Sequence, residues 1–180
     1  MKWLATMKWT LGTAALASLL VGVSSLLPDH EAHAQAATCF DFTTGGGWIQ
    51  SPPPANGKAN FGFNVGYKNG PDSPLQGEFN LVDHGANVTI KMLTVDTYGG
   101  EGNGTGHRCS PTQICDRFWT GTAEITFPDT AFVCAFFVEV VDRGSPGRKD
   151  TFHVTCDGYN GFAFELPAGN IEVHKAACLL

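Results

Sequence analysis

The sequence has few basic residues. Its 180 residues include eleven Lys and Arg against seventeen Asp and Glu, so the formal net charge is −6 at pH 7. A protein that binds nucleic acid needs a surface rich in Lys and Arg to neutralise phosphates. The composition therefore predicts no nucleic-acid partner.

Helical periodicity is also missing, because no stretch repeats its apolar residues at a spacing of 3.6. The chain instead contains 22 Gly, ten Pro and 13 Phe, a composition typical of a turn-rich β protein. Hydrophobic residues make up 43% of the chain, which is enough for one globular core. These features exclude a helical bundle and favour a single β domain.

Alternation of apolar and polar residues marks the strands. In residues 58–68 every odd position is apolar, and residues 75–82 repeat the pattern after a turn signal at 69–72. Further strands are predicted over 88–92, 119–127, 132–141, 152–154, 162–164 and 171–173. We therefore expect an all-β fold, an antiparallel β-sandwich or flattened barrel of about 8–10 short strands stapled by disulfides.

The segment 132–141 differs from the other strands because Glu139 is its only charged residue. An uninterrupted apolar run of this length, rich in Phe and Val, is typical of a central strand. We expect it to be covered on both faces.

The first 34 residues are typical of a signal peptide. Two lysines precede an uncharged apolar run over residues 10–27, and Ala32-His33-Ala34 provides small residues at a cleavage site. We expect cleavage after Ala34, a secreted single domain over 35–180, and no membrane span after cleavage. The alternative is an uncleaved anchor, since the run is about 18 residues long.

Cysteine is scarce, with six residues and no Cys-x2-Cys pair. An even number in an exported chain favours three disulfides, and a zinc site is the competing interpretation. A hairpin centred near Ser145 would place Cys134 opposite Cys156, within disulfide reach. Cys109 and Cys115 would close one loop, and the remaining pair, Cys39 and Cys178, would tie the two ends of the domain together.

Residues 96–116 contain five glycines, His107 and the Cys109/Cys115 pair, and they show no apolar periodicity. They predict a long Gly-rich loop, longer than the scaffold needs. Such a loop is a place where a binding function can reside.

Sequence motifs for nucleophilic hydrolysis and for phosphate binding are absent. The best metal hypothesis is a calcium site, because Asp142 and Asp150 flank a Gly/Pro turn that can add carbonyl oxygens. The alternative is an ordinary long turn whose solvated charges are balanced by nearby Arg and Lys. No other cofactor is indicated.

Three residues are candidates for ligand binding. Trp48 and Tyr98 could stack on a sugar ring, although Trp48 could instead pack in the core beside Ile49. His107 is the third candidate, as a ligand-binding or general-base residue.

Seven segments, taken in order, resemble the post-COAP-type (choice-of-anchor-associated) secreted domains of bacteria, whose function is unknown. The resemblance implies an extracellular β-sandwich-like domain with no established catalysis or cofactor. The segments are Gly45–Ile49, Gly57–Phe63, Gly77–Phe79, Asp83–Gly85, Phe118–Ala123, Val141–Phe152 and Gly169–His174.

The favoured functional hypothesis is a non-catalytic secreted module that binds a glycan or a cell-surface protein. The alternative is a carbohydrate-active or other enzyme with an acid–base site formed by Glu78, Asp83 and His84. A structure separates the two, because acid–base catalysis requires these groups to converge in a pocket.

Overall fold

The computed structural model describes residues 37–100, 114–174 and 178–179. Within these ranges the chain forms twelve strands and no helix, and therefore no helix long and apolar enough to cross a membrane. The strands are β1 (Ala37–Cys39), β2 (Phe42–Gln50), β3 (Lys58–Gly66), β4 (Gln76–Asp83), β5 (Val88–Met92), β6 (Thr97–Gly100), β7 (Cys115–Phe127), β8 (Thr130–Asp142), β9 (Thr151–Cys156), β10 (Tyr159–Ala163), β11 (Ala168–His174) and β12 (Cys178–Leu179).

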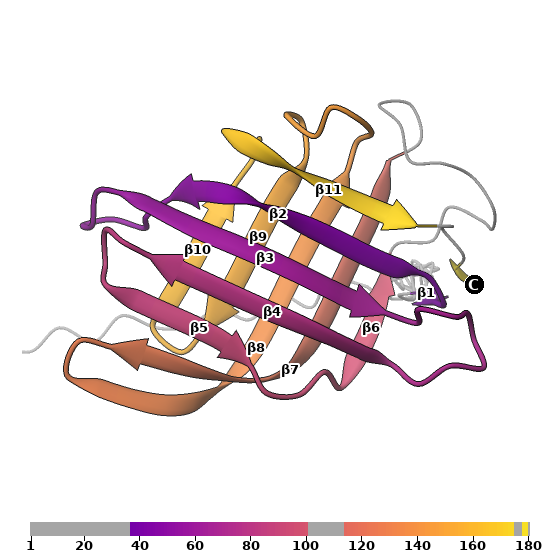
Figure 1. Cartoon of the computed structure of the whole chain (residues 1–180), viewed down its shortest axis with the longest axis horizontal. Coiled ribbons are helices and arrows are strands. Elements are labelled where there is room, and N and C mark those ends of the chain that lie inside the picture. The colour runs from indigo at the N-terminus through magenta and orange to yellow at the C-terminus, as the bar shows by residue number, and fades with distance from the viewer. Residues whose placement is uncertain (1–36, 101–113, 175–177, 180) are drawn as a thin grey trace, which may run out of the picture. The chain divides into compact units, whose positions relative to one another are not determined.

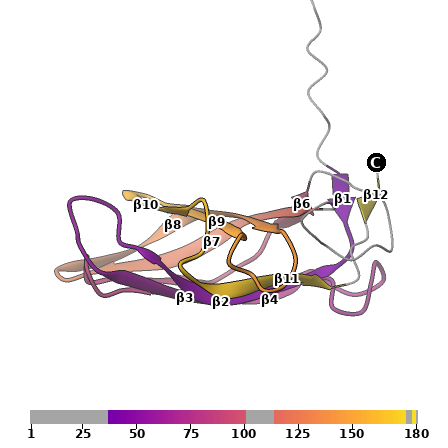
Figure 2. The ribbon, with the colours of Figure 1, turned by 90° about the horizontal axis from the view of Figure 1, so that it is seen from above.

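All twelve strands belong to one antiparallel sheet, whose main path runs β10-β9-β8-β7-β5-β4-β3-β2-β11. The sheet curls into two layers, with β11 and β2–β5 on one side and β6–β10 on the other (Figure 1). The two layers face each other when the domain is viewed from above (Figure 2). The predicted antiparallel β-sandwich or flattened barrel is confirmed.

Strand β7 is shared between the two layers. Its first half pairs with β6, placing Trp119 opposite Tyr98, and its second half pairs with β5, placing Ile125 opposite Ile90. Gly121 lies between the two halves, where a Cβ atom would collide with the carbonyl oxygen of Thr94. Glycine at this position allows the close backbone approach at which the sheet changes partner.

The core forms from the inward-facing residues of both layers, as the alternation in the sequence predicts. Phe61 of β3 and Phe152 of β9 stack across the interior with ring centroids 3.9 Å apart. Trp119, Phe136 and Phe152 are the largest fully buried side chains. Burying such rings removes a large apolar area from water, which is the main favourable contribution to folding.

The prediction that 132–141 is covered on both faces is wrong. The segment is part of β8, which is central in the sheet, but its residues alternate between buried and partly or fully exposed. Phe132 and Val133 are 40% and 59% exposed on this strand. No described element covers the outer face of β8, so its apolar residues remain at the surface.

The Cys134–Cys156 disulfide is confirmed, with the two Cα atoms 5.6 Å apart. The predicted register is shifted by two residues, since Cys156 lies opposite Phe136 rather than Cys134. The disulfide therefore joins Cys156 to the residue two positions beyond its strand partner. Cys134 lies in the part of β8 that continues past the end of β9, and its Cα atom is still within disulfide reach of Cys156.

The predicted loop over 96–116 is partly strand. Residues 97–100 form β6, and Cys115 and Asp116 begin β7, while 101–113 lie outside the described residues. Strand β6 shows no alternation of apolar and polar residues, because two of its four residues are glycine. The predicted signal peptide over 1–34 also lies outside the described residues.

Two further cysteines, Cys39 and Cys115, are disulfide-bonded. The backbone of Cys39 in β1 lies opposite that of Cys178 in β12, in agreement with the predicted pairing of the two ends. Cys109, the predicted partner of Cys115, lies outside the described residues. These two pairings stay predictions.

Candidate functional site

Asp83, the last residue of β4, is buried, and its carboxylate is hydrogen-bonded within the protein. Its Oδ1 atom accepts hydrogen bonds from Ser51 Oγ at 2.5 Å, from Gly85 N at 2.8 Å and from Ala86 N at 3.0 Å. Its Oδ2 atom accepts one from Tyr159 Oη at 2.9 Å. The carboxylate thus ties the turn after β4 to the opposite layer.

These contacts shift the pKa of both Asp83 and Tyr159. Burial acts to raise the pKa of Asp83, but the hydrogen bonds from Ser51, Ala86, Tyr159 and Gly85 outweigh it and lower the pKa. Burial and the hydrogen bond to Asp83 raise the pKa of Tyr159. An ionised carboxylate that accepts four hydrogen bonds is suited to holding structure, and not to donating a proton.

The other two members of the predicted acid–base site lie elsewhere. Glu78 is exposed on the outer face of β4, whereas Asp83 points inward, because the two positions differ by an odd number of residues on one strand. His84 is exposed in the turn that follows. The structure does not bring Glu78, Asp83 and His84 together.

Asp142 and Asp150 are buried, at 3% and 0% exposure, so their charges are not solvated as the simpler interpretation of this turn assumed. All four of their carboxylate oxygens accept backbone N–H groups. The donors to Asp142 are Gly144 at 2.7 Å and Val173 at 2.9 Å, and those to Asp150 are Arg143 at 3.0 Å and Ile171 at 2.8 Å.

The two carboxylates therefore fasten the β8–β9 turn to β11. Burial raises the pKa of both Asp142 and Asp150, against the effect of the backbone N–H donors, which lower it. Within the described ranges, no three His, Cys, Asp or Glu side chains cluster in a way that could hold a metal ion. The calcium hypothesis stays a prediction.

Tyr98 lies inside the domain, so it is not the exposed sugar platform predicted from the sequence. It is 5% exposed, its hydroxyl donates to Asp41 Oδ1 at 2.6 Å, and Thr43 Oγ1 lies 2.5 Å from that hydroxyl. Arg117 holds the same carboxylate, with Nε 3.0 Å from Oδ1 and Nη2 2.6 Å from Oδ2 of Asp41. Burial and the neighbouring Asp41 raise the pKa of Tyr98.

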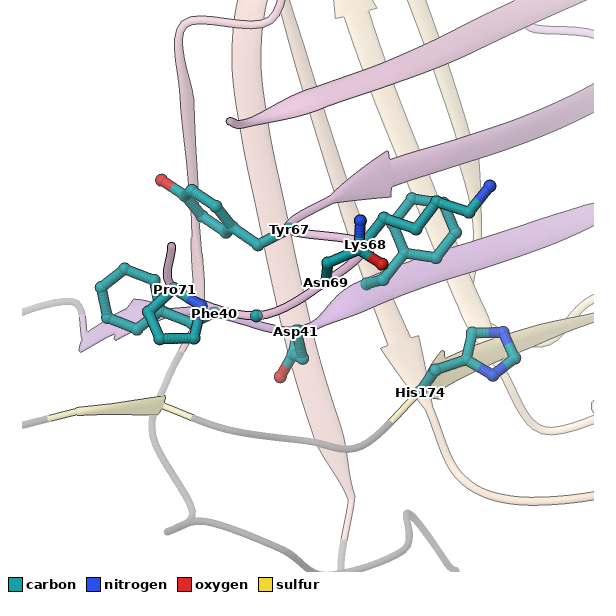
Figure 3. Close-up of a pocket in the computed structure, with 9 residues that line it drawn as sticks. Phe40, Asp41, Tyr67, Lys68, Asn69, Pro71 and His174 are labelled. Atoms are coloured by element: carbon teal, nitrogen blue, oxygen red, sulfur yellow. The ribbon is translucent and has the colours of Figure 1, made fainter. Parts of the chain in front are cut away.

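A pocket of about 650 Å³ lies next to this buried cluster (Figure 3). Aromatic rings form much of its wall, with Phe40 5.2 Å from Tyr67 and Phe42 6.4 Å from His174 between ring centroids. Asp41 also lines it, but its carboxylate is already bound by Arg117 and Tyr98. The Asp41 carboxylate is therefore not available to a ligand in this pocket.

A more favourable site lies on the outer face of β2–β5. Gly46 of β2 and Gly62 of β3 are directly opposite each other and leave a strip of the sheet without side chains. A Cβ atom added at Gly62 would meet no atom within 4 Å, and one at Gly46 would meet only the backbone oxygen of Phe61 at 3.5 Å. We call this strip, formed by Gly46 and Gly62, the glycine trough.

Polar side chains and Trp48 border the glycine trough, although Thr44 Oγ1 already lies 2.8 Å from His174 Nε2 and Asn170 Oδ1 already accepts a hydrogen bond from Gly147 N at 2.9 Å. Trp48 and Asn60 are opposite each other along one border, and Thr44 and Asn64 along the other. Asn170 of β11 lies opposite Gly46 at one end, and Asn80 of β4 lies opposite Gly62 at the other, followed by Lys91 of β5. A depression of about 660 Å³ at the β4 end is lined by Gly62, Phe63, Asn64, Glu78, Phe79, Asn80, Lys91 and Met92.

Trp48 is the one sequence-predicted binding residue at this site. It is partly exposed on the outer face, while its neighbour Ile49 is fully buried, so Trp48 does not pack in the core. Lys58 Nζ lies 4.3 Å from the centroid of the Trp48 ring, in cation–π contact. The asparagines at this site were not predicted from the sequence, because isolated amides in strands carry no motif.

The opposite outer face carries a row of rings, which we call the aromatic row. It crosses four strands through Phe118, Phe137, His153 and Phe162 and continues to Phe164, with ring centroids 6.3, 6.0, 5.5 and 4.3 Å apart in that order. Three of the four contacts are edge-to-face. The rings therefore do not form the flat platform that stacking on a sugar requires.

Two predictions about the 96–116 segment cannot be placed, since His107 and Cys109 lie outside the described residues. No family model matches the chain, and no curated protein and no solved structure matches it significantly. The resemblance to post-COAP-type domains stays a prediction, and any function has to be argued from the geometry.

Proposed function

We propose that this protein is a non-catalytic binding module that holds an uncharged oligosaccharide in the glycine trough. The observation that carries the proposal is the trough itself, a strip free of side chains that is bordered by amides and one tryptophan. Clefts with a few well-placed polar groups and aromatic walls are where small ligands bind.

The chemistry of the borders matches that of a sugar. The amide of Asn carries both donors and acceptors, so Asn60, Asn64 and Asn80 can each satisfy hydroxyl groups in either role. The indole of Trp48 offers one N–H donor and the ring face that Lys58 does not occupy. Glu78 and Lys91, which line the depression together, carry opposite charges and favour a ligand with no net charge.

A binding role is favoured over glycoside hydrolysis because hydrolysis generally needs two carboxyl groups about 5 to 9.5 Å apart. Glu78 is the only carboxylate among the residues that line the depression. Asp83, the other carboxylate of the predicted enzyme site, is turned into the interior and bound by four donors.

Glycan-array binding of the wild type and of the Gly62→Thr variant tests the proposal. Threonine suits a strand, and the position is open, so we expect the variant to keep its thermal midpoint and to lose at least about tenfold in affinity. Trp48→Ala should bind the same glycans more weakly than the wild type does. Ala135→Thr, on the exposed face of β8, adds the same side chain to the other layer and serves as the matched control.

Two results would contradict the proposal. The first is an array on which the folded wild type retains no glycan. The second is equal binding by the wild type and a folded Gly62→Thr variant.

We also propose that the module acts after export. The Cys134–Cys156 disulfide supports this, because disulfides persist in oxidising compartments. The resemblance to secreted domains points the same way. Expression in a host with an export pathway should yield a mature chain whose first residue is Gln35, as determined by mass spectrometry, whereas a chain that retains residues 1–34 would argue against it.

A further inference from the structure

Strand β10 is one end of the main sheet path, and on its far side it pairs with no described strand (Figure 1). It follows β9 after a two-residue turn, with Tyr159 opposite Cys156. Because hydrogen-bonded and non-hydrogen-bonded pairs alternate in such a hairpin, the N–H and C=O groups of Asn160 and Phe162 point away from β9. At this edge, two backbone N–H donors and two backbone C=O acceptors are therefore oriented toward a possible partner strand.

The space beside this edge is partly open. A pocket of about 500 Å³ lies between β10 and the segment after β2, and its lining includes Asn160, Phe162, Pro52 and Pro53. Phe162 of β10 and Phe164 just after it, the end of the aromatic row, are 42% and 79% exposed. An added strand would cover this exposed apolar surface.

The charges around the edge are arranged symmetrically. No charged residue lies between Tyr159 and Phe164, whereas Asp157 and Glu165 are exposed on either side of that span. Both carboxylates lie four residues from Gly161, the middle of the strand. A partner segment with basic residues at both ends would match these charges.

A second copy of this chain does not match them. Two β10 strands paired about a two-fold axis at Gly161 would bring Asp157, in the turn before the strand, toward Glu165 of the second copy, just after its strand, at both ends of the pair. Like charges near one another at both ends repel and disfavour this pairing. The edge is thus arranged against pairing with itself, which is a common protection for edge strands.

We infer that the β10 edge binds an extended segment of a partner protein, with an uncharged, alternately apolar centre and a Lys or Arg at each end. The partner's backbone pairs with Asn160 and Phe162, and its apolar side chains pack on Phe162 and Phe164. Backbone pairing supplies the affinity in this mode of recognition, and the side-chain contacts and flanking charges supply the selectivity.

A displayed peptide library tests this inference, with five randomised central positions flanked by Lys in one pool and by Glu in another. We expect the Lys-flanked pool to yield binders and the Glu-flanked pool to yield none. Asp157→Lys/Glu165→Lys should reverse that preference.

The backbone contribution is tested with Asn160→Pro. Proline removes the outward N–H without removing a bond to β9, so the hairpin should remain folded. The best Lys-flanked peptide should bind this variant at least tenfold more weakly. Asn160→Ala is the matched control, since it loses the same side chain, including the contact of Asn160 Oδ1 with His153 Nε2 at 3.0 Å, but keeps the N–H.

Three outcomes would overturn the inference. One is that neither pool yields a binder, and another is that a folded Asn160→Pro variant binds as well as Asn160→Ala. The third is a dimer of the wild type in sedimentation that Asn160→Pro dissociates, because it would assign the edge to a second copy. Glycan binding in the trough is independent of all three.

Discussion

At the scale of single residues, buried polar side chains join strands that are far apart in the sequence. The Asp41 carboxylate accepts hydrogen bonds from Arg117 and Tyr98, which lie 76 and 57 positions away in the sequence. The Asp83 carboxylate accepts one from Tyr159, which lies 76 positions away. Each of these groups would be costly to bury without a partner. Their pairing therefore selects one arrangement of the two layers.

The Asp41–Arg117 pair gives the first prediction. Arg117→Met leaves the Asp41 carboxylate buried without its cation, and we expect a loss of about 3 to 5 kcal/mol in the free energy of unfolding. The double variant Asp41→Leu/Arg117→Met removes both charges and should be less destabilised than the single variant. Urea denaturation of the three proteins measures this, and a single variant as stable as the wild type would contradict it.

The Asp83 carboxylate gives a prediction on pH. Because the folded-state pKa is lowered, ionised Asp83 stabilises the fold above its ordinary pKa, and this stabilisation is lost as the pH falls through the lowered value. The difference in unfolding free energy between the wild type and Asp83→Asn should therefore shrink from about pH 6 to about pH 2. A difference that stays constant over this range would show that the charge is irrelevant.

Asp142 and Asp150 act with the opposite sign. Burial raises their pKa in the folded state, so protonation favours the folded state, and this contribution is lost as the pH rises through the raised values. The wild type and the Asp83→Asn variant both contain Asp142 and Asp150. The contribution of these two residues therefore cancels in the difference between the two pH profiles of unfolding free energy.

At the scale of the elements, glycine has two different roles in the strands. Gly121 lets β7 pass close to the backbone at Thr94, whereas Gly62 leaves an open strip on the outer face of β3. The two positions look alike in the sequence, since each is a glycine within an alternating strand. Only the neighbouring strands distinguish them.

Alanine at the two positions should therefore have opposite effects. Gly121→Ala places a methyl group against the Thr94 carbonyl and should be clearly destabilising. Gly62→Ala meets no atom and should be neutral or stabilising by up to about 1 kcal/mol, because alanine has less conformational freedom to lose on folding. Thermal unfolding of both variants checks this, and equal midpoints would contradict it.

At the scale of the whole molecule, disulfides hold the curled sheet. Cys134–Cys156 closes a separation of 22 residues, and in the chain-entropy model such a loop contributes about 3 kcal/mol. A bridge between Cys39 and Cys178 would close nearly the whole domain and contribute about 5 kcal/mol in the same model.

Non-reducing peptide mapping should therefore find Cys39 linked to Cys178, Cys109 to Cys115, and Cys134 to Cys156. The first link is expected because β1 and β12 place the backbones of the two residues opposite each other. A peptide joining Cys109 to any residue other than Cys115 would contradict the connectivity. Replacing Cys39 and Cys178 together with Ala should lower the thermal midpoint more than replacing Cys134 and Cys156.

The sequence by itself predicted eight of the twelve described strands, because one buried face imposes a period of two that is visible without any structure. It did not predict β1, β2, β6 or β12, and glycines interrupt the alternation in β2 and β6. It also indicated the Cys134–Cys156 bridge, since a hairpin turn brings both strands together locally. It could not determine which apolar strand remains uncovered: the outer face of β8 is exposed because no element of the described ranges lies over it.

The glycine trough and the β10 edge were decided by tertiary structure alone. Gly46 and Gly62 become neighbours through the β2–β3 register, and Trp48 borders them because Ile49 occupies the inner face. The β10 edge exists because the sheet path ends there. A missing side chain and an unpaired edge are properties of the assembled surface, and only the arrangement of strands creates them.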